Sequence, residues 1–113
     1  MKAIRKLEQV TSTAALISVP LRYEILERLR AGPMIVGDLV EALGENQATI
    51  SKQIAILREA GLLACRPDGR CREYRLASPD LLGAAIDALH ALGADAVVKA
   101  AECRARRAAR GQV

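Results

Sequence analysis

The stretch that decides the fold is Asn46–Leu76, NQATISKQIAILREAGLLACRPDGRCREYRL, because its hydrophobic period changes at Gly61. From Ile50 to Leu57 the apolar residues recur at every third or fourth position, which is typical of one buried face of a helix. Asn46 stands just before this pattern and is a favourable N-cap. After Gly61 the apolar residues come in short extended runs around a turn sequence. The stretch therefore predicts a helix followed directly by a β-hairpin.

The predicted hairpin consists of the runs 62–65 and 71–76 on either side of the turn residues 67–69. Pro67 suits the second position of a type I turn, and Gly69 suits the left-handed bulge position that follows such a turn. We therefore expect a three-residue loop.

This loop would set the register, placing Arg66 opposite Arg70 and Cys65 opposite Cys71. The two thiols would then face each other, with Cβ atoms about 4.5–5.5 Å apart. A two-residue loop would instead put Cys65 and Cys71 on opposite faces of the hairpin. The turn decides whether these cysteines form a pair.

Helical patterns also precede the decisive stretch, over residues 3–17, 20–31 and 35–43. Gly44 suits a left-handed C-terminal cap of the third helix, and the next helix follows over 47–60. Two helices joined by so short a turn form a helix-turn-helix pattern.

After the hairpin, Ser78 and Pro79 suit the cap and first position of a long last helix that runs to about residue 108. The expected fold is mainly α with a small β-hairpin, in the order of a winged helix-turn-helix. We expect one domain over residues 1–108 and a flexible tail over 109–113.

The composition limits the class of protein. Of 113 residues, 51% are hydrophobic but none is Trp or Phe, so the core must be aliphatic. One histidine, with no converging acid, base and nucleophile, argues against an enzyme. The N-terminus lacks the apolar core of a signal peptide, and we expect no window that approaches the roughly 18 apolar residues of a membrane span. These features predict a cytoplasmic protein without a membrane partner.

Four segments carry a family resemblance: TISKQIAILREAGLL, GRCREYRL, VPLRYEILERL and GPMIVGDLVEALG. They resemble the ArsR/SmtB family of winged helix-turn-helix transcriptional repressors. The resemblance implies a homodimer built by the first and last helices. It also implies binding to a palindromic operator in double-stranded DNA, and release when an inducer is sensed.

The residues themselves agree with DNA binding. The side of the 47–60 helix opposite its apolar stripe carries short polar and basic side chains that suit base edges or phosphates, and the hairpin carries arginines. Such residues can also simply face solvent. The predicted DNA-binding residues are Gln47, Thr49, Ser51, Lys52, Gln53, Arg66, Arg70 and Arg72.

A dimer is physically attractive, because one copy offers few phosphate contacts while two copies read two half-sites about one helical turn apart. Its apolar surface would come from the first and last helices. The predicted interface residues are Ile4, Leu7, Val10, Leu82, Ile86 and Leu89.

The inducer is the least determined part. Relatives that bind metalloids use a Cys-x-Cys motif in the third helix, and residues 35–38 hold no thiol here. Asp87 and His90 depart from the spacing of the zinc-type relatives. The cysteines are therefore the remaining candidates, for a soft metal or metalloid ion or for thiol oxidation.

The candidate sensing residues are Cys65, Cys71 and Cys103. Cysteine is also a small hydrophobic residue that packs without chemistry, so two in a hairpin can be coincidence. Two other functions stay open: a winged-helix regulator without a ligand or under the control of a partner protein, and a dimeric scaffold for protein interaction. No cofactor is certain from the sequence.

Overall fold

The structure is a computed structural model that describes residues 2–111, including the side chains of residues 8–111. The chain divides after Pro79 into two compact units, and each is described by itself. Residues 112–113 of the expected tail, and the side chains of Ile4 and Leu7, lie outside the described residues.

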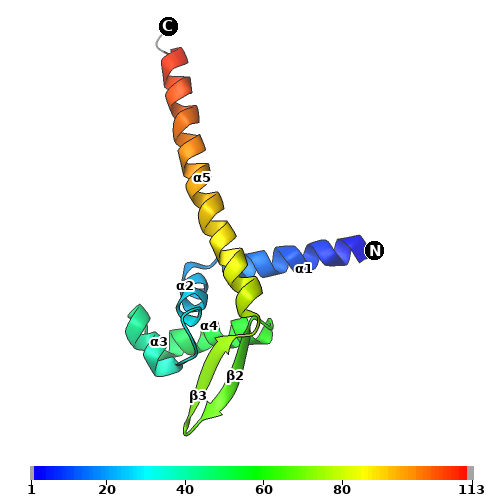
Figure 1. Ribbon diagram of the computed structural model, residues 1–113, viewed down its shortest axis with the longest axis vertical. Coiled ribbons are helices and arrows are strands. Elements are labelled where there is room, and N and C mark those ends of the chain that lie inside the picture. The colour runs from blue at the N-terminus through cyan, green and yellow to red at the C-terminus, as the bar shows by residue number, and fades with distance from the viewer. Residues whose placement is uncertain (1, 112–113) are drawn as a thin grey trace. The chain divides into compact units, whose positions relative to one another are not determined.

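The first unit contains four helices and a three-stranded antiparallel sheet (Figure 1). The second unit is the long last helix, α5. The elements are α1 (Lys2–Ile17), α2 (Pro20–Leu29), β1 (Met34–Ile35), α3 (Val36–Leu43), α4 (Gln47–Glu59), β2 (Leu63–Asp68), β3 (Cys71–Leu76) and α5 (Pro79–Gly111). The predicted winged helix-turn-helix order is confirmed, and α5 extends three residues beyond the expected end.

The core of the first unit is aliphatic, as the composition predicts. Helix α2 contacts α1, α3, α4 and β3, so it lies at the centre of the packing. The buried residues come from one face of each helix and from the base of the hairpin: Ile17, Ile25, Leu26, Leu29, Leu39, Ile50, Ile54, Leu57, Leu63 and Leu76.

The turn between α3 and α4 has the two caps that the sequence predicts. Gly44 adopts a left-handed conformation with φ of 67°, and its N–H donates to the Val40 carbonyl over 3.0 Å. The Asn46 side-chain oxygen accepts a hydrogen bond from the Thr49 N–H over 2.8 Å. Because both helix ends are satisfied within three residues, α4 leaves α3 in a fixed direction.

A second left-handed glycine connects α4 to the sheet. Gly61 has φ of 83°, its N–H donates to the Arg58 carbonyl, and the Leu62 N–H donates to the Leu57 carbonyl. These two bonds form a Schellman motif. The Ala77 N–H then donates to the Leu62 carbonyl over 3.0 Å and closes the base of the hairpin.

The sheet contains one strand more than the sequence predicts. The order is β1-β3-β2, and the added β1 pairs Met34 with Tyr74 and Ile35 with Glu73. Two residues are too few to show an alternating pattern, so this strand has no signal in the sequence. It joins the start of α3 to the hairpin.

Helix α5 differs from the expectation about membrane spans. Its 33 residues are long and apolar enough to cross a membrane by length and composition, with a mean hydropathy of 1.5 over the best window. The prediction that no window approaches such a span is therefore wrong. Large apolar side chains are exposed along this helix: Leu81, Leu89, Leu92, Val97 and Val98.

Replacing Gly61 with alanine should lower the free energy of unfolding by about 1 kcal/mol, because an L side chain is strained in the left-handed region. A Cβ atom there meets nothing within 4 Å, so the loss reports the backbone alone. Urea denaturation measures it. Gly37→Ala is the control: this glycine is helical, and alanine should leave stability unchanged or raise it. Equal effects of the two substitutions would contradict the assigned turn.

Candidate nucleic-acid interface

Helix α4 exposes a narrow face of small, polar and basic residues. Ile50 is completely buried on the opposite side, so the helix cannot rotate without exposing its stripe. The centre of the exposed face holds Ala48, Lys52 and Ala55, with Ser51 beside them. Sequence reasoning missed the two alanines, which let another molecule approach the helix backbone closely.

Two of the predicted contact residues are less open than expected. Thr49 and Gln53 are both half-buried. The Gln53 side-chain oxygen accepts a hydrogen bond from Arg22 Nε over 2.7 Å, which joins α4 to α2. Gln53 therefore holds the helix in place, whereas Gln47, Ser51 and Lys52 are exposed as predicted.

The hairpin register differs from the predicted one. Asp68 pairs with Cys71, so the loop is the two residues Gly69 and Arg70. Gly69 has φ of 61° at the first loop position, as in a type II′ turn. Pro67 lies in β2 instead of the loop, and its missing N–H is tolerated because β2 is an edge strand.

This register separates the two cysteines of the hairpin formed by β2 and β3, which is the wing of the fold. Cys65 pairs with Tyr74, and Cys71 pairs with Asp68, so the two thiols lie on opposite faces of the hairpin. The expected pair of Cys65 and Cys71 is therefore wrong. Cys65 is half-buried, and Cys71 is exposed.

The three predicted wing arginines are exposed but differ in their contacts. Arg66 lies opposite Glu73 and not opposite Arg70, and its Nε forms an ion pair with the Glu73 carboxylate over 2.9 Å. Arg70 stands at the tip of the turn. Arg72 Nη1 lies 3.8 Å from Cys65 Sγ.

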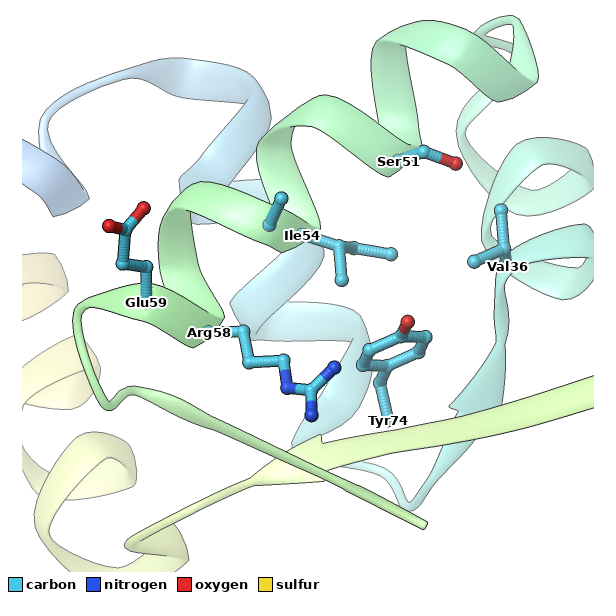
Figure 2. A pocket seen from close by; sticks show the side chains of 7 residues that line it. Val36, Ser51, Ile54, Arg58, Glu59 and Tyr74 are labelled. Carbon is cyan, nitrogen blue, oxygen red and sulfur yellow. The ribbon is translucent and has the colours of Figure 1, made fainter. Parts of the chain in front are cut away.

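An open hollow of about 410 Å³ separates α4 from the hairpin. In Figure 2 the Tyr74 ring rises from β3 toward α4 with Arg58 beside it, and the Ser51 hydroxyl lies at the other end, near Val36. Glu59 also lines the hollow but points away from Tyr74. The hollow thus combines one guanidinium with two hydroxyls, and sequence reasoning missed both Arg58 and Tyr74.

Comparison with known proteins identifies the family. The family of bacterial regulatory proteins called arsR matches residues 20–64. The HTH-type transcriptional regulator NmtR of Mycobacterium tuberculosis is 43% identical over 68 residues, which cover 60% of this chain and 57% of NmtR. The biofilm growth-associated repressor of Agrobacterium fabrum is 34% identical over 88 residues, covering 75% of this chain and 74% of the repressor. This chain belongs to the ArsR family.

The fold agrees with that of an ArsR-like protein of known structure. A winged helix-turn-helix DNA-binding domain, Mb0332 of Mycobacterium bovis, matches with a TM-score of 0.75 at 24% identity, covering 85% of this chain and 88% of that one. The chain spans a little over half the length of the first curated relatives it matches. The predictions of the family and of the fold that the sequence supports are confirmed.

The described residues of this ArsR-family chain do not assemble a metal site. No group of three or more His, Cys, Asp or Glu side chains that could hold an ion occurs among them. Cys103 is exposed on α5, in the second unit. The soft-metal site expected from the cysteines therefore has no support from the geometry of the first unit.

Mild oxidation should not produce a disulfide between Cys65 and Cys71 within one chain, because cysteines whose Cβ vectors point apart cannot be bridged without backbone movement. Peptide mass spectrometry after treatment with diamide measures this cross-link. A positive control is the engineered pair Arg66→Cys and Glu73→Cys, placed directly opposite in the observed register. Efficient cross-linking of the native pair, with none of the engineered one, would contradict the register.

Proposed function

We propose that the chain is a DNA-binding transcriptional repressor that acts as a homodimer on a palindromic operator. The observation that carries this proposal is the exposed face of α4, small and polar at its centre, beside a hairpin whose arginines are exposed. Such a helix fits the major groove, which is about 12 Å wide. A cytoplasmic location follows from the same function.

Different side chains of α4 make different kinds of contact with DNA. Ser51 can donate to or accept from a base edge, and Lys52 carries the charge on the exposed face. Gln47, in the first turn, reaches a base or a phosphate at the end of the helix. Ala48 and Ala55 bring the helix backbone close to the groove and can contact thymine methyl groups.

The hairpin supplies contacts to the DNA backbone. Arg70 at the tip and Arg72 on the strand are open to phosphates, while the Glu73 carboxylate orients Arg66. An exposed ion pair of this kind contributes only about 0.2–1 kcal/mol, so a phosphate can replace Glu73 at small cost. Arg58 and Tyr74 in the hollow add a guanidinium and a hydroxyl between α4 and the wing.

The homodimer is supported by exposed apolar surface. Val10 of α1 and Leu89 of α5 are exposed, as a dimer interface requires of a single copy, whereas Leu82 and Ile86 are already buried within the chain. The related Mb0332 domain is described as homodimeric. Two copies would read half-sites about 34 Å apart.

Because Cys65 and Cys71 lie on opposite faces of the hairpin, the proposed inducer acts on one thiol and not on a pair. A single thiol, Cys65, is the unit that an inducer would modify, because its Sγ lies beside the Arg72 guanidinium and it shares a face of the hairpin with Tyr74. An adduct on this sulfur would displace Arg72 from the wing surface and so weaken the complex with DNA.

Ser51→Ala should weaken binding to the operator by about 1–3 kcal/mol while leaving dimerisation intact, because it removes a contact to a base. Lys52→Gln should lower the salt dependence of binding by about two units, roughly one for each copy in the dimer. Fluorescence anisotropy on a duplex from upstream of the protein's own gene measures both, with a scrambled duplex for comparison. Arg28→Gln is the control: it makes the same change of charge at an exposed position beside Glu24 and Glu27. Wild-type protein that binds both duplexes equally would refute the proposal.

Cys65→Ser should keep repression but abolish release by thiol-directed inducers. The reduced protein is titrated on the operator duplex against arsenite, cadmium and peroxide. Cys71→Ser is the matched control and should still respond, because its sulfur lies on the other face. A Cys65→Ser protein that still releases DNA would end the proposed role of this thiol. Wild-type protein that ignores every inducer would favour a regulator without its own ligand.

A further inference from the structure

The C-terminal part of α5 is strongly basic. Residues 1–98 contain twelve Lys and Arg side chains and twelve Asp and Glu side chains, so this part is formally neutral. Residues 99–113 contain five basic side chains and only Glu102 as an acid, which accounts for the whole net charge of +4. The first unit itself, residues 1–79, holds twelve basic and nine acidic side chains, so both it and this segment carry net positive charge.

The basic residues of this segment follow a helical spacing. Lys99, Arg106 and Arg110 lie at i, i+7 and i+11 on α5, so they share one side of the helix, and Arg107 lies next to them. The side chains of Lys99 and Arg106 are 72% and 73% exposed. At 1.5 Å per residue this basic stripe, as we call these four residues, is about 16 Å long.

Stabilisation of the helix does not explain the stripe. Cations favour the negative end of the helix dipole, but only within the last turn, where Arg110 alone lies. The ion pairs of Lys99 with Asp95 and of Arg106 with Glu102 measure 3.2 and 4.0 Å between exposed groups, and such pairs are weak. Arg107 forms no ion pair with any residue that the structure describes. Neighbouring like charges in the segment repel one another, so the arrangement favours a polyanion as partner.

We infer that the basic stripe of α5 is a second DNA-binding surface, which contacts phosphates without reading sequence. This inference rests on the proposed function, which supplies double-stranded DNA as the polyanion. A duplex carries one negative charge per roughly 1.7 Å, so about ten phosphate charges lie along the length of the stripe. Arginine suits phosphate because its planar fork donates two parallel hydrogen bonds.

The stripe contributes equally to every DNA sequence. It raises the affinity for operator and random duplex by the same factor and speeds the first encounter, while α4 sets the preference between them. Charge at the end of a long exposed helix also acts before the recognition surface is aligned.

The test replaces Arg106, Arg107 and Arg110 of the stripe together by glutamine, and in a matched variant by lysine. All three residue types have similar helix propensities, so circular dichroism should show the same helix in both proteins. Affinity for the operator duplex and for a scrambled duplex is measured from 50 to 200 mM salt. The glutamine variant should lose about one unit of salt slope per lost phosphate contact on both duplexes, or about three- to fourfold per contact over this range. The lysine variant should retain most of the slope.

An unchanged slope in the glutamine variant would overturn the inference, even if the operator is still preferred to the scrambled duplex. The converse result, a slope that falls with no preference for the operator in the wild type, would support the stripe and refute the proposed repressor. A glutamine variant that keeps its salt slope but changes its mass in sedimentation would assign the stripe to contacts between copies and overturn the inference.

Discussion

Burial of the stripe formed by Ile50, Ile54 and Leu57 is the constraint on which the site depends. These three side chains are at most 2% exposed and lie on one side of α4. Exposing any of them would cost roughly 1.5–3 kcal/mol, so the rotation of the helix about its axis is fixed by the core. The side that carries Ser51 and Lys52 is exposed for this reason alone. The hydrogen bond from Arg22 to Gln53 secures one edge of the same arrangement.

The two left-handed glycines turn this fixed helix into a site of defined shape. Gly44 sets the approach of α3, and Gly61 sets the direction in which the chain leaves toward β2. The hairpin therefore begins beside the C-terminal end of α4, and the hollow with Arg58 and Tyr74 lies between them. A surface with an exposed polar helix face and a wing of exposed arginines follows from one core stripe and two backbone turns.

Sequence reasoning succeeded where a residue acts through its own neighbours along the chain. The Asn46 cap and the Gly44 and Gly61 turns have local signals, and each was located correctly. The predicted register of the hairpin was wrong because Pro67 fits either a type I turn or an edge strand. Only the order of strands in the sheet distinguishes these two positions of the proline. The prediction that Gln53 is exposed failed for a similar reason, because its hydrogen-bond partner Arg22 lies thirty-one residues away in the sequence.

The corrected register has a chemical consequence beyond the loss of a cysteine pair. In the predicted register Arg66 and Arg70 would stand opposite each other, and like charges directly opposite destabilise a hairpin. In the observed register Arg66 lies opposite Glu73, so one acid compensates the strand while the charge at Arg70 stays at the tip. The wing can thus present arginines to DNA without strong repulsion in its free state. This compensation means that the placement of charge on the wing, in addition to the formal charge of +3 on residues 1–79, would direct the first unit to its groove.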